Sequence, residues 1–516
     1  MAKPAVSAVT ATVFAAALAG GLLLAMAPGP HGVRLPGQSG GLDAAAAVMV
    51  ALLGAGALGA YVFVFKPREL RGFRRLLLLA LVMVLSVAVS KLFLSITLPD
   101  HDRRYLPYLL PLPAAAMLVT TLLDTGLGLV VAALLAVLTA FVGYELPGAR
   151  AFLLQHPLEP LQMATTFLLA SLVGVAVVQG AARASRYLQA GAAVAAVTFV
   201  SLLAFWLLHP DRHATDLLWM LTAAALAGLL AAVINVGAAL ILGPVFGITT
   251  RMQLMALGQL DHPLLRQLQE QAPGTFHHSV VVGNLAERAA DLIGADALLV
   301  RVGASFHDIG KVAKPAYYIE NQTQGASPYD TLSPLESAQM VSNHVRAGVE
   351  MARRHRVPEP VRAFIPEHHG TRLVTYFYRK AAALDPATDP EAFRYPGPKP
   401  QSRETAIVML ADSVEAVVRS SRDRSPERIE ALVGAVVAER TAEGQLDECA
   451  LTLRDLKTVI ESFTATLRGV YHARIDYPAP AAGERATVAA ALGAPAPLVG
   501  PMDGTAPPPE IKTAGA

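Results

Sequence analysis

The sequence predicts an all-α protein: a polytopic membrane helix bundle of about eight spans, followed by a cytoplasmic domain that is also all-helical. Of the 516 residues, 53% are hydrophobic and only 16% are charged, whereas about 25% charged residues are typical of soluble domains. The long Ala, Leu and Val runs fall in residues 1–250, and residues 251–480 have the composition of a soluble protein. In that second part, segments such as "SVVVGNLAERAADLI" have apolar residues at helical spacing, which predicts helices.

Eight segments are apolar enough to span a bilayer, which takes about 20 residues each. They are residues 5–28, 44–65, 75–98, 105–122, 125–144, 161–181, 190–208 and 217–243. We interpret the first as a retained anchor and not as a signal peptide, because it lacks a strongly basic start and a clean small-residue cleavage site, and because seven spans follow it. Asp124, Thr125 and Gly126 interrupt the apolar region around them, and we interpret them as a tight turn between two spans.

Lys and Arg in the short loops predict the orientation, because such residues concentrate in cytoplasmic loops. Residues 66–75 hold five cations, and the loop after the sixth span carries Arg183 and Arg186. Both loops are therefore expected in the cytoplasm, and with eight spans everything after Arg251 lies there as well. Few charges fall within the spans, which argues against an ion-coupled transporter.

Composition excludes some kinds of site. Cys449 is the only cysteine, so an internal disulfide and a zinc-thiolate site are both excluded. The formal net charge of +2 gives no indication of a nucleic-acid polymer as partner. The C-terminal tail is rich in Ala, Pro and Gly, which predicts disorder.

Polar residues that suit metal binding are concentrated in the second part of the chain. Seven of the 14 histidines fall between His277 and His369. An apolar run, "LLVRVGASF", leads into a His-Asp doublet, and such side chains are costly to bury unless they are paired or hold a metal. Taken one at a time, each candidate ligand can also be explained without a metal, for example as a histidine at a helix start or as part of a polar turn. The candidate ligands are His278, His307, Asp308, His344, His368, His369 and Asp412.

Together, these candidates predict a centre with two metals. Imidazole and carboxylate suit Fe, Mn, Zn and similar divalent ions. Five histidines and two aspartates are too many for one ion, but they suit two ions that share a bridging carboxylate. Adjacent residues on a helix point about 100° apart, so His307 can serve one ion while Asp308 reaches between both. Asp412 lies in an apolar helix, where a buried aspartate needs a cation or several donors.

The doublet His307–Asp308, preceded by His278 and followed by Asp412, resembles the HD superfamily of metal-dependent phosphohydrolases. Longer segments resemble the 7TM-HD family, membrane-bound phosphodiesterases that hydrolyse cyclic di-AMP. These segments are "HPLLRQLQEQAPGTFHHSVVVGNLAE", "FHDIGKVAKPAYYIENQ", "EHHGTRLVTYFYRKA" and "FRYPGPKPQSRETAIVMLADSVEA". The resemblance covers residues 262–477 and extends into the membrane half at "YLPYLLPLPAAAMLVTTLLD".

The resemblance implies a site, a reaction and a location. Hydrolysis of cyclic di-AMP to linear pApA would use two iron or manganese ions, with Asp308 and Lys311 as catalytic residues and Lys311 as the phosphate contact. The protein would lie in a bacterial-type cell membrane, with the lipid bilayer and cyclic di-AMP as partners, and a homodimer remains open. One ion would be bound by His278, His307, Asp308 and Asp412, and the other by Asp308, His344, His368 and His369.

Hydropathy, composition and the resemblance together divide the chain into five parts. Members of the family usually have a large extracellular domain after the first span, but only about 14 residues stand there in this sequence. A second departure is "ASPYD" at residues 326–330, where an Asn-Pro-His version is expected. The parts are an N-terminal membrane anchor (1–28), a short extracytoplasmic loop in place of a sensor domain (29–43), a seven-span membrane domain (44–250), a cytoplasmic HD phosphohydrolase domain (251–480) and a disordered tail (481–516).

Four alternatives remain open. A cyclic di-GMP phosphodiesterase of the HD-GYP type would carry a Gly-Tyr-Pro triplet downstream of the double histidine, and "HHGTRLVTYFYRKA" has none. Another cyclic nucleotide is a related alternative. A membrane receptor that binds nucleotide without cutting it would be expected to lack a ligand, and a transport protein with a regulatory domain would carry more charge within its spans.

Overall fold

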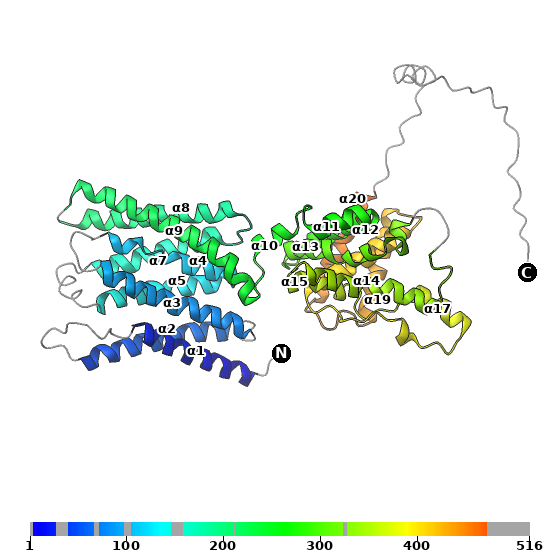
Figure 1. Ribbon diagram of the computed structural model, residues 1–516, viewed down its shortest axis with the longest axis horizontal. Coiled ribbons are helices and arrows are strands. Elements are labelled where there is room, and N and C mark those ends of the chain that lie inside the picture. The colour runs from blue at the N-terminus through cyan, green and yellow to red at the C-terminus, as the bar shows by residue number, and fades with distance from the viewer. Residues whose placement is uncertain are drawn as a thin grey trace, which may run out of the picture. The chain divides into compact units, whose positions relative to one another are not determined.

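The computed structural model describes residues 4–26, 40–66, 72–97, 105–145, 158–210, 212–322 and 328–471. Within these ranges the regular structure is helical, with one isolated bridge between Leu373 and Arg394, so the predicted all-α class is confirmed (Figure 1). Residues 29–39 of the predicted extracytoplasmic loop and the predicted tail, 481–516, lie outside the described residues. Residues 40–43 of that loop belong instead to a helix.

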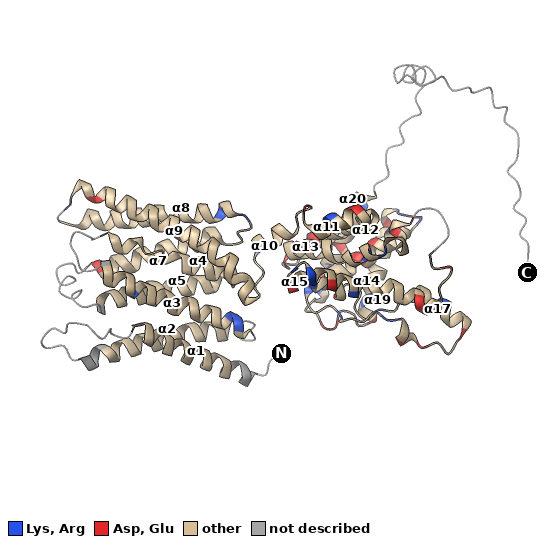
Figure 2. Cartoon of the chain, viewed as in Figure 1, with Lys and Arg blue, Asp and Glu red and all other residues tan. Residues whose placement is uncertain are grey.

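The first half is a bundle whose long helices lie side by side (Figure 1). Among the described residues, seven helices are long and apolar enough to cross a membrane, and few charged side chains lie along them (Figure 2). The helical elements are α1 (Pro4–Met26), α2 (Gly40–Phe65), α3 (Phe73–Thr97), η3 (Leu106–Leu109), α4 (Pro113–Leu122), α5 (Thr125–Glu145), α7 (Glu159–Val178), α8 (Ala184–Leu208) and α9 (Ala214–Phe246).

The region of the fourth predicted span is not one continuous helix. It consists of the 3-10 turn η3 and the ten-residue helix α4, and ten residues of α-helix are only about 15 Å long. The local sequence explains the break, because Pro111 and Pro113 lack the backbone N–H of a helix interior and disfavour helical geometry in the residues before them.

The chain nevertheless passes from one end of the bundle to the other in this region. Tyr105 and Tyr108 pack with Leu202 and Met220, where α8 ends and α9 begins. At the far end of α4, Asp124 forms an ion pair with Lys66, at 2.8 Å, just beyond the end of α2. The broken segment therefore makes the crossing that the sequence assigned to a single helix, and the prediction of about eight spans is confirmed.

The last membrane helix ends on the same side as the cation-rich loop. A side chain at Gly247 would contact the guanidinium of Arg74, 3.5 Å away. Gly247 has φ 68° and caps α9 in the left-handed conformation, which glycine adopts without steric cost. Thr250 then accepts a hydrogen bond from the Gln253 N–H and begins α10. The second half of the chain thus leaves the bundle at the end where Lys66 and Arg74 lie.

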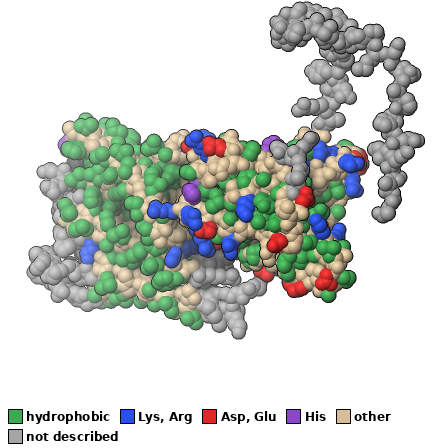
Figure 3. Space-filling model, turned by 45° about the vertical axis from the view of Figure 1, so that its right-hand side comes forward, with side chains coloured by type: hydrophobic (Ala, Val, Ile, Leu, Met, Phe, Trp, Pro, Cys, Tyr) green, Lys and Arg blue, Asp and Glu red, His purple; other side chains and the backbone are tan. Residues whose placement is uncertain are grey.

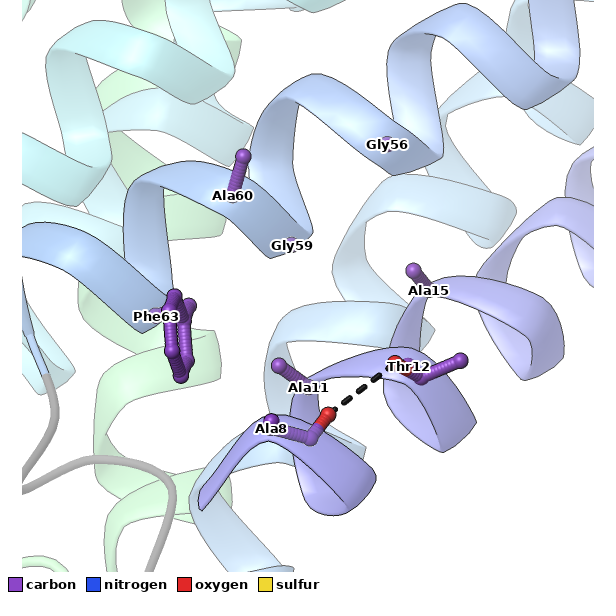
Figure 4. Close-up of a pocket in the computed structure, with 8 residues that line it drawn as sticks. All are labelled: Ala8, Ala11, Thr12, Ala15, Gly56, Gly59, Ala60 and Phe63. Atoms are coloured by element: carbon purple, nitrogen blue, oxygen red, sulfur yellow. Dashed lines mark hydrogen bonds between the residues drawn. The ribbon is translucent and has the colours of Figure 1, made fainter. Parts of the chain in front are cut away.

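Small residues let α1 approach α2 closely. A pocket between the two helices is lined by Ala8, Ala11, Thr12, Ala15, Gly56, Gly59, Ala60 and Phe63 (Figure 4). A Cβ at Gly59 would lie 3.0 Å from that of Ala15, and small residues of this kind favour close packing of membrane helices. Phe14, Leu18 and Leu22 of α1 are buried in the bundle core, so α1 packs as part of the bundle.

The outer surface of the bundle is apolar, as expected for a protein that has lipid as its solvent. Large side chains such as Leu53, Val137 and Leu218 are more than half exposed, and hydrophobic side chains cover this part of the surface in Figure 3. The chain is therefore a multi-pass membrane protein.

The second half is a helical domain with its own core. Buried residues such as Leu268, Phe306, Ile309 and Ile365 form its main cluster. Its elements are α10 (Arg251–Leu257), α11 (Pro263–Gln271), α12 (Pro273–Leu292), α13 (Ala297–Phe306), η4 (Ile309–Ala313), η5 (Pro315–Tyr317), η6 (Ile319–Asn321), α14 (Pro334–Arg354), α15 (Glu359–Arg362), α16 (Phe364–Glu367), α17 (Thr375–Leu384), η7 (Pro390–Phe393), α18 (Arg403–Ser420), α19 (Pro426–Ala442) and α20 (Leu453–Val470).

Local sequence signals determine where these helices begin. Ser333 and Glu336 form a reciprocal capping box at the start of α14, with Pro334 in its first turn. Such boxes satisfy two backbone N–H groups that the helix itself leaves unpaired. Ser402 and Thr405 do the same for α18. The start of a helix determines which of its residues share a face, and α14 and α18 both carry candidate ligands.

Candidate metal centre

The His307–Asp308 doublet lies at the turn between α13 and η4. Helix α13 ends at Phe306, and Asp308 leaves the helical conformation with φ −111° and ψ 13°. The turn is held against α14 by a close backbone approach at Gly310. A Cβ there would overlap the carbonyl oxygen of His344 and lie 2.6 Å from the N atom of Gly348. Only a residue without a side chain allows this approach, which brings Asp308 beside His344.

All seven predicted ligands come together in the structure. One group consists of His278 from α12, His307 after α13 and Asp412 from α18. In each group, the atoms that could bind a metal lie within 4.8 Å of one another. The second group consists of Asp308, His344 from α14, and His368 and His369 after α16.

The Asp308 carboxylate lies between the two groups. Its Oδ2 atom is 3.2 Å from His307 Nε2 and 3.8 Å from His278 Nε2. Its Oδ1 atom is 3.4 Å from His344 Nε2 and 3.6 Å from His368 Nε2. Each carboxylate oxygen thus faces one ligand group, which is the arrangement that a bridging carboxylate requires.

The histidine rings have the orientation of metal ligands. The Nδ1 atoms of His307, His344 and His368 donate hydrogen bonds to the carbonyl oxygens of Ala304, Val341 and Ile365, at 2.6, 2.6 and 2.8 Å. These bonds place the proton on Nδ1 and leave the Nε2 lone pair available, as the outer partners of metal ligands commonly do.

The Nε2 atoms of these three histidines, and Asp308 Oδ1, are buried without a hydrogen-bond partner among the described residues. Leaving such groups unsatisfied is costly. Divalent cations would satisfy them, since His307 lies in one ligand group and the other three atoms lie in or face the second, so the donor sets fit such ions.

At His344 and Asp308 the electrostatics favour a neutral imidazole beside an ionised carboxylate. At His278, by contrast, burial is outweighed by hydrogen bonds to Asp412 and Glu415, which raise its pKa to about 9. Burial lowers the pKa of His344 to about 4, and Lys311 and His368 act in the same direction. Burial alone would raise the pKa of Asp308, but the charge of Lys311, together with interactions with His307 and His368, outweighs it and holds that pKa well below its ordinary value. Since a metal displaces protons from its ligands, these shifts prepare Asp308 and His344 for binding.

Lys311, the predicted phosphate contact, lies directly beside the proposed bridge. Its Nζ atom is 2.7 Å from Asp308 Oδ2 and 2.8 Å from Glu320 Oε1, and its side chain is 13% exposed. Glu320 also accepts a hydrogen bond from the Thr275 hydroxyl, at 2.9 Å. The ammonium group is therefore held at the edge of the cluster by two carboxylates.

Sequence reasoning missed three residues that contact members of the cluster: Glu320, Glu415 and Tyr395. Glu415 Oε2 accepts a hydrogen bond from His278 Nδ1 at 2.6 Å. A signal for Glu415 was present, since it follows Asp412 by three residues on one helix, and such residues share a face. The Tyr395 ring stacks on that of His369, with centroids 4.1 Å apart. This contact has no local sequence signal, because it depends on a loop that returns to the site.

Comparison with known proteins identifies both halves. Residues 43–250 match the family described as "7TM receptor with intracellular HD hydrolase". Residues 275–417 match the HD domain family. The chain belongs to the 7TM-HD family. An HD domain implies divalent-metal binding, and all seven clustered residues lie within the matched range of this 7TM-HD protein.

Two curated relatives of this 7TM-HD chain carry the name cyclic-di-AMP phosphodiesterase PgpH. The protein of Bacillus subtilis (strain 168) is 36% identical over 373 residues, which are 72% of this chain and 51% of the relative. The protein of Listeria monocytogenes serotype 1/2a (strain 10403S) is 34% identical over 395 residues, which are 76% and 53% of the two chains. The chain thus spans about half the length of these relatives.

A solved structure is also similar to the 7TM-HD chain. The crystal structure of the L. monocytogenes PgpH HD domain in complex with cyclic-di-AMP is 43% identical in sequence. The match covers 41% of this chain and 100% of that chain, with a TM-score of 0.41.

Proposed function

We propose that this chain is a membrane-anchored phosphodiesterase that uses two metals to hydrolyse cyclic di-AMP to linear pApA. The observation that carries the proposal is the Asp308 carboxylate, with one oxygen facing each of two groups of ligand atoms. The reaction and substrate are supported by the two relatives named cyclic-di-AMP phosphodiesterases, which are 36% and 34% identical.

The proposed ligand sets follow the two groups. One ion is assigned to His278, His307, Asp308 and Asp412, and the other to Asp308, His344, His368 and His369. Imidazole and carboxylate donors suit iron or manganese, which are the ions that we propose. Bound together, two such ions would supply an activated water and would offset charge on the phosphate.

The chain's own residues perform the positioning. The backbone carbonyls of Ala304, Val341 and Ile365 hold three imidazole rings through Nδ1. Asp308 is 1% exposed, so bulk water has little access to the proposed bridge. We assign to Lys311 a contact with a phosphate oxygen, because its compact positive charge lies beside Asp308 at the edge of the cluster.

The full-length protein, purified in detergent with Mn²⁺ or Fe²⁺, tests the substrate. Given cyclic di-AMP and cyclic di-GMP side by side, it should cut cyclic di-AMP to pApA with a kcat/KM at least about tenfold higher, or about 1.4 kcal/mol in transition-state stabilisation. Chromatography of the products over time measures both rates. Equal or reversed rates would contradict the assignment of cyclic di-AMP. Tight binding without hydrolysis of either nucleotide would favour the receptor alternative.

The proposed location is a bacterial-type cell membrane with the HD domain in the cytoplasm. The support is the position of the cations, since Lys66 and Arg74 lie at the end of the bundle from which residue 251 departs. Reporter fusions at Gly72 and Ala516 should both report the cytoplasm, while a fusion at Pro210, between α8 and α9, should report the opposite side. A cytoplasmic signal at Pro210, or an external one at either other position, would refute this topology.

A further inference from the structure

The proposed ligand histidines are held in place in two different ways. His307, His344 and His368 each use Nδ1 to bind a backbone carbonyl, and His278 uses Nδ1 to bind the Glu415 carboxylate. In all four, the ring nitrogen that points away from the cluster is hydrogen-bonded. Such outer bonds fix the tautomer and the plane of a ligand ring.

His369 has no such bond. Neither of its ring nitrogens is hydrogen-bonded to a described residue, and Nδ1 faces the cluster, 3.9 Å from Asp412 Oδ2. Its side chain is 14% exposed, more than those of His344 and His368. A ligand at the edge of the cluster, without an outer hydrogen bond, needs another restraint on its ring.

Tyr395 covers the ring of His369. The two rings are nearly parallel, with an interplanar angle of 28° and centroids 4.1 Å apart. On the cluster side, His368 lies with its centroid 3.9 Å away, and His344 meets the ring edge-on at 5.2 Å. The imidazole is therefore enclosed between its neighbouring ligands and the phenol ring.

Hydrogen bonds to backbone carbonyls hold Tyr395 to the segment that carries His369. The Tyr395 N–H donates to the carbonyl of Arg372 at 2.9 Å, three residues after His369. The guanidinium of Arg394 donates to the carbonyl of Thr371 at 3.2 Å, and Leu373 forms a bridge with Arg394. Because these bonds tie the two segments together, the phenol ring has a fixed position relative to His369.

We propose that Tyr395 is a positioning residue of the second metal site. Its ring fixes the plane of His369 by stacking, as hydrogen bonds do for the other four ligand histidines. Stacked aromatic rings attract one another beyond the gain from burial alone, which favours one orientation of the imidazole. The inference rests on the proposed ligand role of His369. It assigns the effect to the aromatic face and not to the hydroxyl group.

Metal affinity of the full-length protein tests this inference. The variants are Tyr395→Phe, which keeps the ring, and Tyr395→Leu and Tyr395→Met, which remove it. His369→Ala serves as the reference for loss of the ligand itself. Tyr376→Leu is the matched control, because Tyr376 is 72% exposed and lies outside the cluster.

Each protein is stripped with a chelator and titrated with Mn²⁺, whose binding is followed by electron paramagnetic resonance. Circular dichroism checks the fold, and Tyr395→Met provides a second ring-less variant if Tyr395→Leu does not fold.

The expected result separates ring from hydroxyl. Tyr395→Phe and Tyr376→Leu should bind two ions as the native chain does. The ring-less variants should bind the more weakly held of the two ions about 10–100-fold less tightly. This is the range of about 10–100-fold found when a residue that orients a metal ligand is removed. Native affinity in the folded ring-less variants would overturn the inference, and so would a Tyr395→Phe variant as impaired as they are. Two ions retained by His369→Ala would instead refute the proposed ligand set itself, and the inference with it.

Discussion

Replacing Asp308 with Asn should leave the folded protein with almost no bound divalent metal, whereas His344→Ala should still hold about one ion per chain. The difference follows from the two oxygens of Asp308, which lie 3.2 Å from His307 Nε2 and 3.4 Å from His344 Nε2. The Asp308→Asn substitution removes the shared negative charge that offsets repulsion between two dications. Such repulsion is large in a poorly solvated site, so both ions should be lost.

His344→Ala removes a donor from the second group alone. His278, His307, Asp308 and Asp412 would remain to hold the first ion. Both variants should nevertheless lose hydrolysis by about a thousandfold or more, the upper range for removing one group that stabilises the transition state. Loss of activity therefore does not distinguish the two variants, but the number of bound ions does.

Elemental analysis of the purified proteins measures the number of ions, and circular dichroism shows whether each variant is folded. His355→Ala is the matched control for loss of a histidine, since His355 lies at the end of α14, outside both ligand groups. It should retain two ions. Two ions in the folded Asp308→Asn variant would show that Asp308 is not the bridge.

Gly310→Ala should destabilise the HD domain by about 3 kcal/mol, at the upper end of the usual cost of overpacking. The added Cβ would overlap the carbonyl oxygen of His344 and lie close to the N atom of Gly348. These are backbone atoms, so no side-chain rotation can relieve the clash, and η4 must move away from α14. That movement would separate Asp308 from His344, so metal content should fall together with the melting temperature.

Gly434→Ala is the control for this prediction. Gly434 lies within α19, and a Cβ there would meet nothing within 4 Å. Because alanine favours an α-helix by about 1 kcal/mol over glycine, this variant should be slightly more stable than the native chain. Thermal unfolding of both variants, followed by circular dichroism, gives the comparison. Equal stability of Gly310→Ala and the native chain would refute the proposed role of the close approach.

The sequence was informative about the metal ligands because they are chemically out of place. Asp412 in the apolar helix "AIVMLADSVEAVV" and the doublet after "LLVRVGASF" are expensive to bury without a partner. The residues that contact the ligands from outside the cluster, Glu415 and Tyr395, were less evident from the sequence. A glutamate such as Glu415 ordinarily lies on the solvated face of a helix, so its spacing from Asp412 was a weaker signal than an aspartate within an apolar run. Tyr395 reaches His369 through the backbone contacts of a returning loop, which leave no periodicity in the sequence.

The membrane half shows a similar limit. Hydropathy located the apolar segments, because a bilayer imposes both length and composition on them. It did not reveal that the fourth crossing is broken, because hydropathy measures polarity and not the missing N–H groups of Pro111 and Pro113. The Lys66–Asp124 ion pair shows that the broken segment still reaches the other end of the bundle. This contact joins residues from different spans, so it becomes visible only in the folded bundle.

Because the ligands are far apart in the sequence, the metal centre can be completed only late in the synthesis of the chain. His278 and Asp412, whose side chains meet at 3.0 Å, are 134 residues apart in the sequence. During synthesis the ribosome therefore delivers the membrane helices and most of the histidines well before α18 emerges. Until then the first ligand group lacks Asp412, and Glu415 cannot yet orient His278. Complete metal loading is thus an event that follows translation of α18, when the nascent chain is already anchored in the bilayer.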